Sequence, residues 1–129
     1  MPGEKHEHAE RPMTLPPAAQ QAIMQLQTFQ QQANALAMQR ESLTIQKIEL
    51  ERALEELKKA ADKEDVYKAV GPVLIKSSKS SMVKELGEKR ETADVRLKSI
   101  EKQNAKIHEK IKEIQGKLGE MLRGDGKAS

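Results

Sequence analysis

The sequence contains no cysteine and no tryptophan, and its only aromatic residues are Phe29 and Tyr67. The absence of cysteine excludes disulfide bonds and thiolate chemistry. Aromatic rings supply much of the buried area of a compact core. Because only 2% of the 129 residues are aromatic, the aliphatic side chains must be buried in another way, and packing between elongated helices is the arrangement this composition favours.

Long apolar runs are also missing. No stretch approaches the roughly 18 apolar residues of a membrane span, and residues 1–14 lack the apolar core of a signal peptide. The sequence therefore predicts a cytoplasmic protein that does not bind a membrane.

Charge of one sign never dominates a long stretch, although the net charge is +3. Residues 66–129 carry the basic excess, with fifteen basic and nine acidic side chains. Lys and Glu alternate there, as is typical of a solvated helix face, and no basic arm precedes a helix. We therefore expect no nucleic-acid partner.

Two stretches carry apolar residues at the spacing of coiled coils. An apolar residue recurs every seven positions from Leu15 to Leu57, and alternate steps of three and four run from Val83 to Met121. These stripes predict helices over residues 15–63 and 80–122, folded back as an antiparallel coiled-coil hairpin. Tails over residues 1–14 and 123–129 are expected to be disordered.

Polar residues interrupt both stripes, at Arg40 and Lys47 and at Arg90 and Asn104. Such residues either penalise wrong pairings or face solvent at a loosely packed waist. The pattern leaves the register open by one heptad, because Leu54 can pair with Leu86 or with Ala93.

Residues 64–79 differ from both helices. The runs "VYKAV" and "VLIKSS" favour β structure and are separated by Gly71-Pro72, which predicts a β-hairpin. A two-stranded hairpin is marginal alone and leaves its outer edges unpaired. We expect those edges to pair with strands of other subunits, and Ser80 or Ser81 to cap the second helix.

The first helix begins with an unusual surface. Residues 12–39 contain no charged residue and eight Gln. Apolar side chains also lie off the stripe, as at Ile23, Met24 and Met38. Such a surface either grips varied partners or packs on another subunit or helix.

These features resemble one family. The segment "DVYKAVGPVLIKSS" followed by "ELGEKRETADVRLKSIEKQ" is similar to the β-class subunits of prefoldin, a hexameric co-chaperone. The single hairpin between the helices is similar to the β class, whereas α-class subunits have two. The resemblance covers roughly residues 14–122 and is of the archaeal type.

The resemblance implies a specific assembly and activity. Two α-class and four β-class subunits would join their hairpins into a barrel between subunits, from which the coiled coils project. The complex would hold unfolded client polypeptides without ATP, prevent their aggregation and deliver them to a group II chaperonin.

Two sets of residues would carry these roles. The tip residues, expected at the distal coiled-coil ends to bind clients, are Ala19, Ala22, Ile23, Met24, Leu26, Leu118, Met121 and Leu122. The hairpin residues, expected to assemble the subunits, are Val66, Tyr67, Val70, Gly71, Val73, Leu74 and Ile75.

No constellation of residues suggests an enzyme, a cofactor or a metal site. His6 and His8 lack a second pair of ligands, and His108 is expected to face solvent. The alternative to a holdase is a structural or tethering coiled-coil oligomer that holds no clients.

Overall fold

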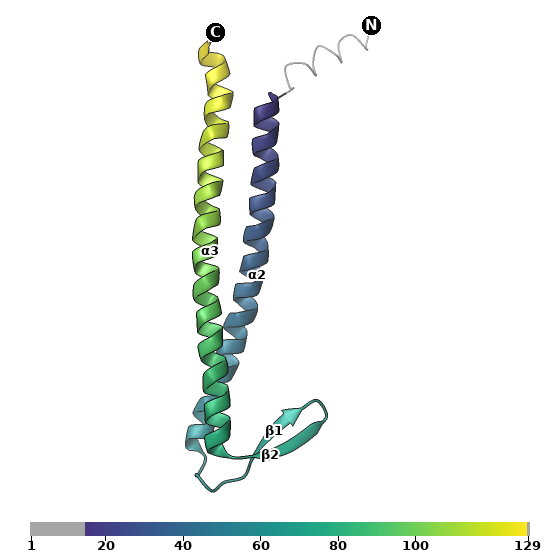
Figure 1. Ribbon diagram of the computed structural model, residues 1–129, viewed down its shortest axis with the longest axis vertical. Helices are drawn as coiled ribbons and strands as arrows, with labels where there is room; N and C mark the ends of the chain where they lie inside the picture. Colours follow the sequence, from purple (N-terminus) through teal and green to yellow (C-terminus); the bar gives the residue numbers. More distant parts are fainter. Residues whose placement is uncertain (1–14, 129) are drawn as a thin grey trace. The chain divides into compact units, whose positions relative to one another are not determined.

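The structure, a computed structural model, describes residues 15–128. They form helix α2 (Pro17–Lys59), strands β1 (Val66–Val70) and β2 (Val73–Ser77), and helix α3 (Lys79–Ala128), in that order (Figure 1). This confirms the predicted fold of two long helices with one short antiparallel hairpin between them.

The chain divides into two compact units. Unit 1 joins Met1–Asn34 to Ala105–Ser129, of which residues 15–34 and 105–128 are described, and unit 2 is Ala35–Asn104. Each unit therefore contains one segment of α2 and one of α3, and the hairpin belongs to unit 2.

The element boundaries differ from those expected. Helix α2 ends at Lys59 and not at residue 63, while α3 continues to Ala128, beyond residue 122 where a tail was expected. The four glycines near this end disfavour a helix by about 1 kcal/mol each, but α3 contains no proline to stop it. The expected tail over residues 1–14 lies outside the described residues.

The buried residues of both units fall on the predicted apolar stripes. In unit 2 they are Leu36, Leu54, Ala93 and Ile100, and in unit 1 they are Ala19, Ala22 and Ile114. Each is at most 9% exposed. The sevenfold pattern of the sequence therefore marks the helix–helix seam correctly.

An ion pair fixes how the two helices of unit 2 align. Lys47 Nζ lies 2.6 Å from Asp94 Oδ1. Because the two helices run in opposite directions, seven residues onward from Lys47 and seven back from Asp94 bring Leu54 level with Gly87. Leu54 therefore pairs beside Leu86 and not beside Ala93, which resolves the register that the sequence left open.

The bend between α2 and the hairpin is held by a lysine. The Nζ of Lys79 donates to the carbonyl oxygen of Ala60 at 2.9 Å and lies 3.4 Å from a carboxylate oxygen of Asp62. Only 21% of the Lys79 side chain is exposed. A cation here satisfies carbonyl groups that the helix end leaves without partners.

The cap of α3 is not at the expected serine. The backbone N–H of Ser81 donates to Ser78 Oγ at 3.2 Å, so Ser78 is the N-cap and not Ser80 or Ser81. The single residue Ser78 also forms the whole connection between β2 and α3. The cap therefore lies one residue after the strand, where it fixes the start of the helix.

The turn of the hairpin is as short as two antiparallel strands allow. Val70 pairs with Val73, so Gly71 and Pro72 form a two-residue turn. Gly71 has φ of +58°, and Pro72 has its φ set near −65° by its ring. Glycine with positive φ at the first turn position is the requirement of a type II′ turn, whose twist suits a hairpin.

Candidate functional site

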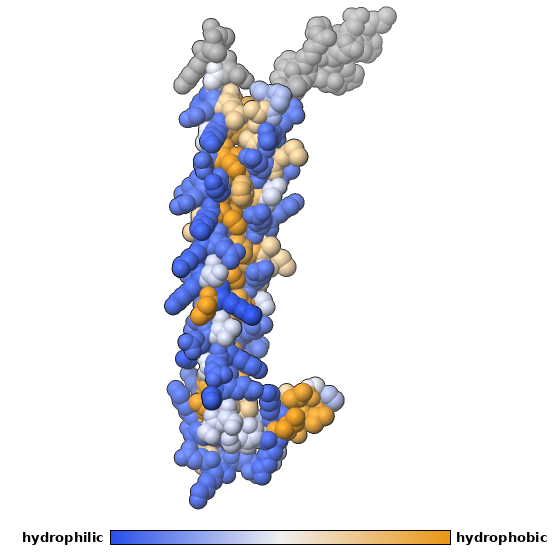
Figure 2. Space-filling view, in the orientation of Figure 1, coloured by the Kyte–Doolittle hydropathy of each residue, from blue (hydrophilic) through white to orange (hydrophobic). Residues whose placement is uncertain are grey.

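The hairpin presents large apolar side chains to solvent. The exposed fractions of Tyr67, Val70, Val73, Leu74 and Ile75 range from 48% to 69%. Figure 2 shows a separate hydrophobic cluster on the projecting hairpin. A cluster of this kind on a small sheet is typical of a protein–protein interaction site.

The remaining hairpin residues occupy supporting positions. Val66 is half-buried at the start of β1, and Gly71 forms the turn. Within residues 15–128 the sheet has two strands only, so each strand pairs along one side and has an open edge on the other. The open edges and apolar side chains together form a surface suited to further strand pairing.

One ion pair ties the hairpin to a helix. Lys68 Nζ on β1 lies 2.6 Å from Glu85 Oε1 on α3, and 39% and 35% of the two side chains are exposed. The hydrogen bond from Lys68 lowers the pKa of Glu85. Sequence analysis did not find this contact, since neither residue lies on an apolar stripe.

The tip residues all lie in unit 1 but differ in exposure. Ala19 and Ala22 are buried, at 0% and 6% exposed, and therefore pack inside the unit. Ile23, Leu26, Leu118 and Met121 are half-buried. Met24 and Leu122 are open to solvent, with 67% and 50% exposed.

The two helical segments of unit 1 differ in charge. Residues 17–34 of α2 carry no charged side chain, whereas residues 105–124 of α3 carry five basic and three acidic side chains. Exposed apolar and amide groups therefore gather on the α2 side. His108, on α3, is exposed as expected.

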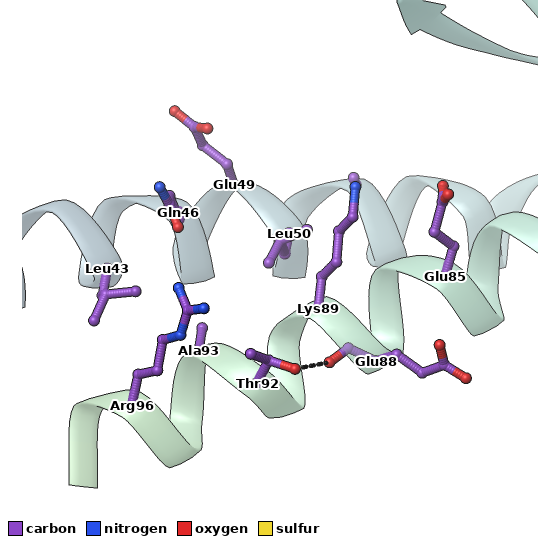
Figure 3. A pocket seen from close by; sticks show the side chains of 11 residues that line it. Leu43, Gln46, Glu49, Leu50, Glu85, Glu88, Lys89, Thr92, Ala93 and Arg96 are labelled. Atoms are coloured by element: carbon purple, nitrogen blue, oxygen red, sulfur yellow. Dashed lines mark hydrogen bonds between the residues drawn. The ribbon is translucent and has the colours of Figure 1, made fainter. Parts of the chain in front are cut away.

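A groove in unit 2 was not predicted. It has a volume of about 580 Å³, and its apolar lining residues are Leu43, Leu50, Ala53 and Ala93. Acidic and basic side chains, such as Glu49 and Lys89, stand at its rim (Figure 3). The small side chains of Ala53 and Ala93 leave this space open near the seam. Ala93, a small residue on the apolar stripe, is the feature of the sequence that could have indicated the groove.

Residues 15–128 contain neither a helix that could span a membrane nor a cluster of candidate metal ligands. Neither helix combines the length and apolarity that a membrane span needs. No group of three or more His, Cys, Asp or Glu side chains in this range could hold a metal ion. His6 and His8 lie outside the described residues.

Comparison with known proteins identifies the family. The family model for prefoldin subunits matches residues 20–125. The chain belongs to the prefoldin subunit family. A prefoldin β subunit from Archaeoglobus fulgidus is 44% identical over 108 residues, covering 84% of this chain and 93% of the relative. One from Methanococcoides burtonii is 42% identical, covering 87% and 96%.

Solved prefoldin structures show the same architecture. The crystal structure of the prefoldin β subunit from Thermococcus strain KS-1 matches with a TM-score of 0.79 at 36% identity, covering 85% of this chain and 96% of that one. The β2 subunit of the same strain, at 18% identity and a TM-score of 0.63, shares the fold. The resemblance to archaeal β-class prefoldin subunits is thereby confirmed.

Proposed function

We propose that this chain is a β subunit of a prefoldin hexamer, with two α-class and four β-class subunits, that acts in the cytoplasm. The hexamer holds unfolded polypeptides without ATP, prevents their aggregation and passes them to a group II chaperonin. Membership of the prefoldin family supports the chaperone role, and the exposed hairpin supports assembly with other subunits.

One observation carries the client-binding part of the proposal. Met24 and Leu122 are exposed in unit 1, where the α2 segment has no charge to repel or select a client. Methionine is flexible and polarisable, so it adapts to side chains of different shape. Such a surface suits weak binding of many unfolded sequences.

The tip residues divide into two roles on this proposal. Met24 and Leu122 contact the client, with Ile23, Leu26, Leu118 and Met121 contributing their exposed edges. The buried Ala19 and Ala22 keep the helices of unit 1 together and do not touch the client. Each contact is weak, and several subunits that hold one client supply the avidity.

A matched pair of variants tests client binding. Met24→Glu with Leu122→Glu places charges on the proposed site, while Val95→Glu changes a side chain that is 62% exposed on α3 in unit 2. Hexamers reconstituted with an α-class subunit are mixed with a chemically denatured model substrate, and light scattering reports its aggregation. The double variant should lose most of its protection, and Val95→Glu should keep it.

The same assay separates a holdase from a tethering oligomer. If the unchanged chain forms the hexamer but does not suppress aggregation, the result favours a tethering oligomer and overturns the holdase proposal. Equal protection by the double variant and Val95→Glu would instead reject these residues as the client site.

A further inference from the structure

The two faces of the β-hairpin carry different residues. Side chains alternate between faces along a strand, and residues paired across strands share a face. Because Lys68 pairs with Ile75 and Tyr67 with Lys76, the hairpin has two distinct sets. The helix-side face carries Val66, Lys68, Val70, Val73, Ile75 and Ser77, and the outer face carries Tyr67, Ala69, Leu74 and Lys76.

Exposure distinguishes the two faces. On the helix-side face, Val66, Lys68 and Ser77 are half-buried, whereas every residue of the outer face is exposed. Leu74, on the outer face, is 69% exposed, more than any other large apolar side chain of the hairpin. The chain itself therefore covers one face in part and leaves the other open.

The Lys68–Glu85 ion pair lies on the partly covered face. Among the ion pairs of residues 15–128, it alone joins a strand to a helix. The second ion pair of the hairpin, Lys76 with Asp65, has 3.4 Å between its atoms and involves the loop before β1. The connections at either end of the hairpin, residues 60–65 and Ser78, lie outside helices and strands.

We infer that the Lys68–Glu85 ion pair positions the hairpin so that its outer face packs against the hairpin of a neighbouring prefoldin subunit. This inference rests on the proposed assembly. It adds which face of the hairpin is buried between subunits and which contact orients the hairpin. The chain's own α3 is tied to the opposite face. Another hairpin can both cover Tyr67, Ala69 and Leu74 and extend the open strand edges.

A first experiment tests the positioning role. Glu85→Gln removes the charge that binds Lys68, and Asp65→Asn makes the same chemical change at the other hairpin ion pair. Each chain is titrated with an α-class subunit, and native mass spectrometry measures the concentration at half-assembly. We expect Glu85→Gln to raise it by up to about fivefold at low salt, as for a partly exposed pair, with little effect of Asp65→Asn.

Rescue distinguishes positioning from a general loss of stability. Lys68→Glu combined with Glu85→Lys restores the attraction with reversed charges, and should recover part of the assembly that either single change loses. Circular dichroism melting of each chain checks that the helices are intact. Equal half-assembly concentrations for Glu85→Gln and the unchanged chain, or no recovery in the swapped pair, would overturn the positioning role.

A second experiment tests which face is used. Tyr67 is the only tyrosine of the chain, so a chain labelled with fluorotyrosine has one fluorine resonance, located on the outer face. On assembly with an unlabelled α-class subunit, this resonance should shift and resist broadening by a soluble paramagnetic chelate. In a matched variant, Tyr67→Phe with Val73→Tyr, the label lies on the helix-side face and should change less.

The outcomes separate this inference from the proposed function. Assembly in which the Tyr67 label stays accessible while the label at position 73 becomes protected would assign the opposite face and overturn the inference alone. Failure of the unchanged chain to assemble, with an α-class subunit or with itself, would overturn the assembly proposal and this inference together.

Discussion

Lys47 on α2 and Asp94 on α3 form an ion pair with 2.6 Å between Nζ and Oδ1, and about a third of each side chain is exposed. Lys47 occupies a position of the apolar stripe, where a cation is costly without a partner. Asp94 supplies that partner from the facing helix. The interruption at Lys47 thus selects a register, whereas Arg40 is exposed and forms no ion pair within residues 15–128.

Reversing this pair should be better tolerated than breaking it. Asp94→Asn leaves Lys47 unpaired at the seam and should lower the melting temperature by about 2–4 °C, as expected for a partly exposed pair. Lys47→Asp combined with Asp94→Lys should regain most of that loss. Circular dichroism melting at low salt measures both, and identical melting of all three chains would show that the pair does not select the register.

Acid should weaken the helix pairing and the hairpin contact. Hydrogen bonds from Lys47 and Lys68 lower the pKa of Asp94 and Glu85 in the folded chain. Both carboxylates therefore stabilise the fold above their ordinary pKa values, and this contribution is lost as the pH falls through the lowered ones. The melting temperature should decline below about pH 4, less steeply in Asp94→Asn. A parallel decline in that variant would contradict the assignment.

At alkaline pH the ion pair is lost through deprotonation of Lys47, so its contribution to stability falls as the pH rises. The hydrogen bond to Asp94, and the negative charge of that carboxylate, raise the pKa of Lys47 in the folded chain. Its contribution is complete below the ordinary lysine pKa and is lost only as the pH rises through the raised value. Stability at neutral pH is therefore unaffected by its titration.

The serine that caps α3 can be identified by substitution. Ser78→Ala removes the oxygen that accepts from the Ser81 N–H and should reduce the free energy of unfolding by about 1 kcal/mol. Ser80→Ala is the matched control and should change it by less than about 0.5 kcal/mol. Urea unfolding of both variants measures the difference, and a larger loss in Ser80→Ala would return the cap to the position that the sequence suggested.

The same substitution should have opposite effects at two glycines. Gly71→Ala places a side chain on a residue with φ of +58° and should cost about 1–2 kcal/mol. Gly116→Ala in α3 should stabilise by about 1 kcal/mol. A Cβ at either position meets no atom within 4 Å, so backbone conformation alone decides the sign. Chemical unfolding tests it, and destabilisation by both would point to contacts absent from the isolated chain.

Truncation separates assembly from client holding. A chain that lacks residues 1–24 and 118–129 loses every tip residue except Leu26 but keeps the hairpin and unit 2. It should still assemble with an α-class subunit, as measured by native mass spectrometry, and should fail to protect a denatured substrate. ATP should change neither result. Full protection by the truncated hexamer would refute the placement of the client site in unit 1.

The local elements were predictable because their signals are local. The apolar spacing placed Leu36, Leu54 and Ile100 on the seam, and Gly71-Pro72 between two β-prone runs placed the turn. The motif around Tyr67 resembles that of prefoldin subunits, and the family model matches the chain over residues 20–125. Each of these depends on residues that lie near one another in the chain.

The long-range choices were not predictable from the same signals. A coiled coil repeats every seven residues, so a shift by one heptad satisfies the same pattern, and only the contact between Lys47 and Asp94 removes the degeneracy. The grouping of Ala22 with Met24 as client-binding tip residues did not follow the stripe, because Ala22 lies on it and is buried, whereas Met24 lies off it and is exposed.

The two helices, the short hairpin and the prefoldin family follow from the sequence alone, because helix periodicity, turn chemistry and motif are properties of neighbouring residues. Contacts between distant parts of the chain set the register of the seam and the face of the hairpin tied to α3 through Lys68 and Glu85. Those choices depend on which distant side chains meet, and that is fixed only when the helices pack.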